Sequence, residues 1–196
     1  MDNVVTNILL SGVGGQGIIL ASDIMTEVFL DYGFDVKKSE VHGMAQRGGS
    51  VTSHVRFGRK VYSPIIKEGE VDILFSFEQL EGLRWINYVK HDGTILLNNY
   101  RINPPAVNLG QMEYPRNIPE IIRKRFNKFY LVDGTKLAFE LGNIRAANII
   151  LLGAISNLFE MEESAWINAI LAKLPSKLHA INKKAFATGK GSGLAI

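Results

Sequence analysis

The chain of 196 residues contains no cysteine. This absence excludes disulfide bonds, thiolate zinc sites, a cysteine nucleophile and any cysteine-ligated iron–sulfur cluster held by this chain alone. Long apolar runs are also absent, because the longest candidate, residues 146–155, is about half the roughly 18 residues of a membrane span. The N-terminal MDNVVTN has no basic region of the kind that begins a secretory signal. We therefore expect a cytoplasmic protein with no membrane partner.

Acidic residues are missing from Ser164 to the C-terminus, although this stretch carries Lys173, Lys177, Lys183, Lys184 and Lys190. A basic face of this kind suits a phosphate-bearing ligand or an acidic partner protein, while a solvated helix surface is the more ordinary interpretation. Aromatic residues are scarce here too, since Phe186 stands alone after Trp166. Nucleic-acid binding is therefore not expected, because single-strand binding surfaces need interleaved aromatic residues for base stacking.

The remaining composition is that of a globular protein, with 46% hydrophobic and 21% charged residues. The length predicts one domain over residues 1–196. Short apolar runs alternate with amphipathic ones, which indicates an α/β fold. We expect strands over residues 6–12, 34–43, 50–58, 71–77, 93–99 and 129–134. We expect helices over residues 17–32, 78–90 and 117–126, with successive helices covering the chain after residue 134.

These elements predict a Rossmann-like, mostly parallel sheet flanked by helices, with a β-hairpin insertion and a helical C-terminal third. The hairpin is expected over residues 50–64, where 59–64 pairs back across the Gly58 turn. Asn117 is expected to cap the N-terminus of the helix that follows it.

The first glycine-rich motif runs from the first strand into the first helix. Gly12, Gly14 and Gly17 have the G-x-G-x-x-G spacing, and free N–H groups at such a helix start favour an anion. A nicotinamide site also needs an acidic residue at the end of the second strand. Asp35 begins the candidate strand, and Glu40 precedes a segment unlike a Rossmann continuation. The motif therefore leaves two interpretations open, a stand-alone NAD(P)- or FAD-binding oxidoreductase and a tight turn required for packing.

The second motif, residues 37–58, is the least generic part of the chain. It brings together several polar residues and glycines, namely His42, Gln46, Arg47, His54, Arg56, Gly43, Gly48 and Gly49. An arginine before two glycines can present its planar fork beside exposed backbone N–H groups, which suits a phosphate or carboxylate. Histidines without a neighbouring carboxylate pair are more often structural than catalytic. Ser50 and Ser53 lack the strand–turn–helix elbow of a serine hydrolase, so nucleophilic catalysis is not expected.

Together, residues 12–22 and 39–58 resemble the gamma-type chain of 2-oxoacid:ferredoxin oxidoreductases. Within that family the two motifs are most similar to those of the small (beta) subunits of the indolepyruvate type. The resemblance continues through residues 142–155, with Asn143 and Asn148 in family-like positions, and through residues 181–189. It covers nearly the whole chain.

The resemblance implies a Rossmann-like domain without a bound nicotinamide, in a complex that oxidatively decarboxylates a 2-oxoacid to an acyl-CoA. Thiamine diphosphate and the iron–sulfur clusters would belong to a cysteine-rich large subunit, ferredoxin would accept the electrons, and coenzyme A would accept the acyl group. This chain would be catalytically inactive alone, with no catalytic residue and no metal ligand. The expected cofactor-binding surface, facing coenzyme A or the large subunit, comprises Gly14, Gly15, Gln16, Gly17, His42, Gly43, Gln46, Arg47, Gly48 and Gly49.

Overall fold

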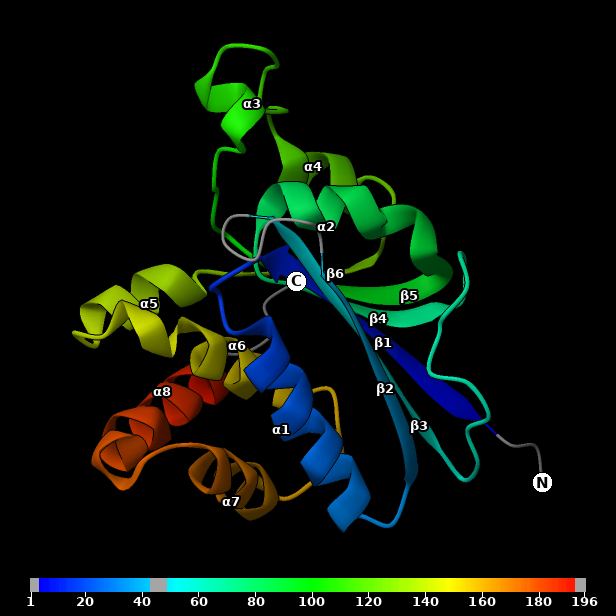
Figure 1. The fold of residues 1–196 in the computed structure, drawn as a ribbon, viewed down its shortest axis with the longest axis vertical. Helices are drawn as coiled ribbons and strands as arrows, with labels where there is room; N and C mark the ends of the chain where they lie inside the picture. The colour runs from blue at the N-terminus through cyan, green and yellow to red at the C-terminus, as the bar shows by residue number, and fades with distance from the viewer. Residues whose placement is uncertain (1–3, 43–48, 193–196) are drawn as a thin grey trace.

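A computed structural model describes residues 4–42 and 49–192, with only the backbone of His42. Its centre is a six-stranded sheet in the order β2-β3-β1-β4-β5-β6 (Figure 1). The strands are β1 (Val5–Val13), β2 (Asp35–His42), β3 (Ser50–Gly58), β4 (Val71–Ser76), β5 (Val89–Asn98) and β6 (Lys128–Val132). The α-helices are α1 (Ile18–Asp31), α2 (Gln79–Trp85), α3 (Pro105–Asn108), α4 (Ile118–Arg123), α5 (Gly134–Glu140), α6 (Ala147–Ser156), α7 (Glu163–Lys173) and α8 (His179–Gly191). Three 3-10 turns complete the described elements, η1 (Ile86–Tyr88), η2 (Ile144–Ala146) and η3 (Ser176–Leu178).

The predicted fold class is confirmed. Strands β1, β4, β5 and β6 run parallel, whereas β3 runs antiparallel to both of its neighbours, β1 and β2. The last part of the described chain, from α5 onward, is helical.

The hairpin lies elsewhere than predicted. Residues 59–64 form no strand, and β3 pairs instead with β2 on one side and β1 on the other. Both edges of β3 are therefore occupied, which leaves no free edge for residues 59–64. Arg56 binds this segment from the side, donating from Nη1 to the carbonyls of Ser63 and Ile65 at 2.9 and 3.0 Å.

Helices cover both faces of the sheet, and each face has its own hydrophobic cluster (Figure 1). Helices α1, α6, α7 and α8 pack on the face to which Ile8 and Leu10 point. Helices α2 and α4 pack on the opposite face, against Leu9 and Leu74. This alternation along β1 and β4 is what a strand with both faces buried requires.

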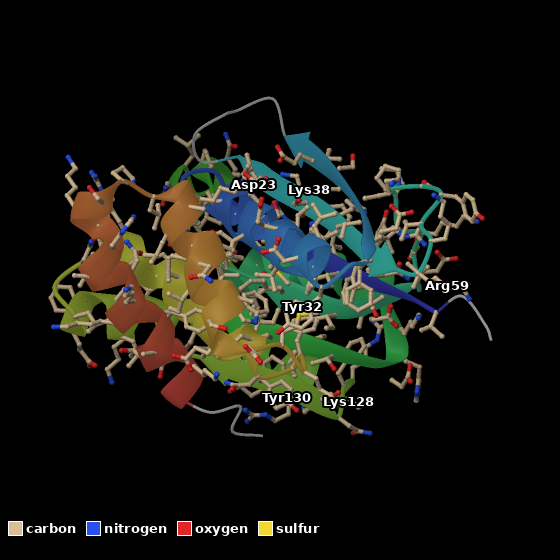
Figure 2. The ribbon with its side chains drawn as sticks, turned by 90° about the horizontal axis from the view of Figure 1, so that it is seen from below. Asp23, Tyr32, Lys38, Arg59, Lys128 and Tyr130 are labelled. Carbon is tan, nitrogen blue, oxygen red and sulfur yellow. The ribbon has the colours of Figure 1, made fainter. Side chains whose placement is uncertain are left out.

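Two specific contacts tie helices to their neighbours on the first face. Lys38 of β2 forms an ion pair with Asp23 of α1, and the two side chains lie together in Figure 2. Helices α6 and α8 cross at backbone contact, because a Cβ atom on Gly189 would lie 1.8 Å from the Ile150 carbonyl oxygen. This close crossing fixes α6 and α8 against each other.

Candidate functional site

The glycine-rich turn after β1 has a backbone that other residues would not adopt or fit. Gly15 and Gly17 have φ of 101° and 79°, in the left-handed region that favours glycine. A Cβ atom on Gly12 would lie 2.7 Å from Gln16 Oε1, and one on Gly17 would lie 2.4 Å from Asn148 Nδ2. The turn is therefore required for packing, and the same glycines bring its backbone to the surface.

Gln16 holds this turn to the next parallel strand. Its Oε1 accepts from the Val13 amide at 2.7 Å, and its Nε2 donates to the Phe77 carbonyl at 2.9 Å. The side chain thus bridges the ends of β1 and β4, at the carboxyl edge where open α/β sheets bind ligands.

The two sequence motifs meet at this edge. The Gly14 amide donates to the Gly49 carbonyl at 2.9 Å, and next to it Ser50 Oγ donates to Glu81 Oε2 at 2.6 Å. Burial raises the pKa of the Glu81 carboxyl, and Arg84 also binds it at 2.7 Å. The predicted residues Gly43, Gln46, Arg47 and Gly48, and the side chain of His42, lie outside the described residues.

A cavity of about 470 Å³ opens beside the turn. It lies where β1, β4 and β5 end and where α5 and α6 begin. Its lining residues are Gly14, Gly15, Gln16, Gly17, Phe77, Asn98, Tyr100, Ile102, Thr135, Ile144, Arg145, Ala147, Asn148 and Leu151. Four of the predicted site residues, the first four of this list, therefore line one cavity.

The electrostatics of the cavity favour an anionic ligand. Among the described residues that line it, Arg145 is the one charged residue and none is a carboxylate. Helices α1 and α6 both start at this wall, and neither has a side-chain cap or an acidic residue in its first turn. The positive dipole ends of both helices and the first-turn N–H groups of α1 attract an anion. In α6, which continues from η2, the Ala147 amide already donates to the Ile144 carbonyl and the Ile149 amide to Asn148 Oδ1.

Two asparagines of the lining retain unused hydrogen-bonding capacity. Asn148 is 6% exposed, and its Nδ2 donates to no group among the described residues. Asn98 is 1% exposed, and its Oδ1 is buried without a partner while its Nδ2 binds Phe77 and Thr135. Asn148 Nδ2 is therefore available to donate to a ligand in the cavity. Asn98 Oδ1 is too deeply buried for a ligand in the cavity to reach it.

A projecting segment, residues 101–116, forms the wall beyond β5 and carries α3 away from the sheet (Figure 1). Its base is held by the buried Glu78, whose Oε1 accepts from Tyr114 Oη at 2.6 Å and from the Ile102 amide at 3.0 Å. Burial and the bond to Glu78 raise the pKa of Tyr114 above its usual range. Arg101 stacks over the Tyr114 ring at 4.0 Å.

The acidic residue of a nicotinamide site is absent from this edge. Asp35 pairs with Gly58 of β3, and Gly58 pairs with Val5 at the start of β1. Asp35 therefore lies at the opposite end of the sheet, about 26 Å along β1 from Val13. Glu40 lies two strands away from β1 and binds Lys38 at 2.6 Å. The antiparallel β3 occupies the position where a Rossmann fold places its second parallel strand.

His54 has the contacts of a structural histidine. It is 5% exposed, and its Nδ1 accepts from the Ile66 amide at 3.2 Å. Burial, reinforced by Arg56, lowers its pKa. Within residues 4–42 and 49–192, no group of three or more histidine, aspartate or glutamate side chains is placed to hold a metal ion. No helix in the same part of the chain has the length and apolarity to cross a bilayer.

Sequence reasoning missed several residues of the cavity. Arg145, Tyr100 and Thr135 come from three separate segments, and no local motif marks them. Asn98 had a weak signal, a polar residue at the end of a buried strand. Asn148 was singled out only through the family resemblance.

Comparisons with known proteins identify the family of the chain. The family model for pyruvate ferredoxin/flavodoxin oxidoreductase matches residues 7–191. The chain belongs to this family. It is 40% identical over 188 residues to indolepyruvate oxidoreductase subunit IorB of Pyrococcus horikoshii, with 93% of each chain covered. It is 34% identical to the IorB subunit of Archaeoglobus fulgidus, with 96% of each covered.

Two solved structures share the fold. The gamma subunit of a keto/oxoacid ferredoxin oxidoreductase from Geobacter sulfurreducens superimposes with a TM-score of 0.69 at 26% identity, covering 94% of this chain and 95% of that one. A 2-oxoglutarate:ferredoxin oxidoreductase from Magnetococcus marinus, solved with 2-oxoglutarate, coenzyme A and succinyl-CoA, gives a TM-score of 0.75 at 22% identity. The match covers 97% of this chain and 31% of that one, so the fold there forms part of a longer chain. Relatives of this chain are thus subunits of 2-oxoacid ferredoxin oxidoreductases.

Proposed function

We propose that this chain is the small, cluster-free subunit of a thiamine-diphosphate-dependent 2-oxoacid ferredoxin oxidoreductase that converts an aryl pyruvate, such as indolepyruvate, to its acyl-CoA. Its partner would be a cysteine-rich large subunit that carries thiamine diphosphate and the iron–sulfur clusters, with ferredoxin as the electron acceptor in the cytoplasm. The 40% identity to an indolepyruvate oxidoreductase subunit supports this assignment.

The observation that carries the role of this chain is the cavity at the carboxyl edge of the sheet. The start of α1, the cation of Arg145 and the free Nδ2 of Asn148 fit the phosphates and amide groups of coenzyme A. Gly15 and Gly17 would present backbone N–H groups to the phosphates, and Arg145 would neutralise them. The Gly14 amide is engaged with the Gly49 carbonyl. Coenzyme A, when bound, supplies the thiol that accepts the acyl group.

The remaining predicted residues extend this surface. Gln16 would hold the turn in shape rather than bind the cofactor, because both ends of its amide are engaged. The Gly14–Gly49 bond supports a contribution from the Arg47-Gly48-Gly49 segment, together with His42, Gly43 and Gln46.

Reconstitution tests the proposal. The full chain alone is expected to decarboxylate no 2-oxoacid, whereas the complex with its large subunit forms acyl-CoA and reduces ferredoxin. Replacing Arg47 with Ala in that complex is expected to weaken assembly or to raise the coenzyme A requirement. Turnover by the chain alone would refute the subunit role. Micromolar binding of NAD(P) or FAD, about −8 kcal/mol, would favour the stand-alone oxidoreductase instead.

A further inference from the structure

We propose that a second cavity, next to the first, binds the base of an adenine nucleotide. This cavity has a volume of about 380 Å³ and lies between α1, the η2–α6 segment and the η3–α8 segment. It shares Arg145 and Asn148 with the first cavity. The identity of the natural ligand rests on the proposed function. That ligand would be coenzyme A, with its adenosine end in the second cavity and its thiol arm in the first.

The walls of the second cavity suit a flat ring. Leu20 of α1, Leu174 at the end of α7 and Leu178 of η3 line it from separate elements. Apolar side chains on the walls with a few polar groups at the edge are the usual composition of a small-ligand site.

Asn182 of α8 supplies the polar edge. The residue is 6% exposed, and its Nδ2 donates to the Leu178 carbonyl at 2.8 Å. An asparagine amide has two N–H donors and one acceptor oxygen, so one N–H and the whole of Oδ1 have no partner among the described residues. A free donor beside a free acceptor is the pattern with which an asparagine amide binds adenine at N7 and N6.

The bond to Leu178 also fixes the orientation of the amide. If the amide flipped, Oδ1 would face the Leu178 carbonyl, and two acceptors would meet. In the proposed pose, Oδ1 therefore faces the exocyclic group of the base. Adenine offers an N–H donor there, whereas hypoxanthine offers a carbonyl oxygen. The site should consequently prefer adenine to hypoxanthine.

The charges around the second cavity suit phosphates. Arg145 is the one charged residue of this lining within residues 4–42 and 49–192, and both cavities share it. The segment that supplies Leu174, Leu178 and Asn182 belongs to the stretch from Ser164 onward that has no acidic residue. A nucleotide with its base on Asn182 would therefore place its phosphates in a region without competing carboxylates.

The test compares ADP with IDP by calorimetric titration of the full chain. The two bases differ at the exocyclic group and at the adjacent N1, which carries a hydrogen only in hypoxanthine. We expect the wild-type chain to bind ADP about tenfold more tightly than IDP. The variant Asn182→Leu should lose this difference and bind ADP about tenfold more weakly. Asn157→Ala is the matched control, because Asn157 also donates to backbone carbonyls but lines neither cavity.

Equal binding of ADP and IDP by the wild-type chain, or no binding of either, would overturn the proposal. This comparison uses the wild-type chain alone, so it does not depend on the folding of a variant. The cofactor assignment is tested separately with coenzyme A as a competitor. If ADP shows the expected preference and coenzyme A does not displace it, the base site stands and the coenzyme A assignment fails. If coenzyme A binds while Asn182→Leu leaves its affinity unchanged, the base site fails and the assignment stands.

Discussion

The backbone amide of Gly14 donates a hydrogen bond of 2.9 Å to the carbonyl of Gly49. This bond joins the glycine-rich turn after β1 to the residue that precedes β3, so the two distinctive motifs of the sequence lie together at one edge of the sheet. The adjacent bond from Ser50 to Glu81 ties the same point to α2. The turn is therefore held from three directions, by Gly49, by α2 through Ser50, and by β4 through Gln16.

Removing the Ser50 hydroxyl tests how much the Ser50–Glu81 hydrogen bond contributes to stability. In Ser50→Ala the Glu81 Oε2 atom loses its 2.6 Å donor while it remains buried. We expect the free energy of unfolding to fall by about 1–3 kcal/mol, as measured by urea denaturation. Ser63→Ala, in an exposed segment, should change it by less than about 0.5 kcal/mol. Equal effects of the two substitutions would contradict a specific role for the Ser50–Glu81 bond.

The projecting segment should loosen when Tyr114 loses its hydroxyl. Tyr114→Phe keeps the ring under Arg101 but removes the group that donates to Glu78 and accepts from the Leu80 amide. We expect faster tryptic cleavage after Arg101 and Arg116, followed by mass spectrometry. The control Tyr62→Phe changes a side chain that is 86% exposed and should leave the cleavage rate unaltered. An unchanged rate in Tyr114→Phe would show that the hydroxyl does not hold the segment.

The crossing of α6 and α8 should tolerate no added methyl group. A Cβ atom on Gly189 would lie 1.8 Å from the Ile150 carbonyl oxygen, which belongs to the backbone and cannot rotate away. We expect Gly189→Ala to cost about 3 kcal/mol of unfolding free energy. Gly191→Ala, on the same helix but facing open space, should be neutral or slightly stabilising. A loss below about 1 kcal/mol in Gly189→Ala would contradict the close crossing.

Acid should destabilise the protein through His54. Its folded pKa lies below 6.5, so at pH values under 6.5 the unfolded chain binds a proton that the folded chain resists. The stability it contributes is therefore complete above pH 6.5 and is lost as the pH falls. Glu81, whose folded pKa is raised, has the opposite sign, and Asp35, with a pKa lowered to about 2, contributes only at lower pH.

The measurement compares urea midpoints at pH 7.5 and pH 5.5. We expect the wild type to lose more of its unfolding free energy than His54→Asn, which keeps an acceptor for the Ile66 amide. His91→Asn, which replaces an exposed histidine, should behave like the wild type. An equal pH response of wild type and His54→Asn would exclude His54 as the source.

The fold was predictable because local patterns carry it. The strand that ends at Val13 and the helix that begins at Ile18 follow directly from an apolar run, glycines and helical periodicity. The strand predicted over residues 59–64 is wrong, since local pattern cannot tell that β2 already occupies the free edge of β3. Asn117 lies at the expected N-cap position, but it has φ of 58° and its side chain makes no capping bond.

The site was predictable only in part. The glycine turn marks one wall, but the other walls come from Asn98, Thr135 and Arg145, which are brought together only by parallel strand order and the α6–α8 crossing. In the sequence, neither Thr135 nor Arg145 carries a local pattern that distinguishes it from a surface residue.

The most direct measurement is the coenzyme A dependence of the reconstituted complex with Arg145→Ala, the shared cation of both cavities. Losing a charge-assisted bond to a phosphate from an exposed arginine should raise the coenzyme A KM about tenfold. The turnover number at saturating coenzyme A should stay close to that of the wild type. Arg59→Ala, at the opposite end of the sheet next to Gly58, should leave both constants unchanged. A wild-type coenzyme A KM in Arg145→Ala would contradict a coenzyme A site at the carboxyl edge of this sheet.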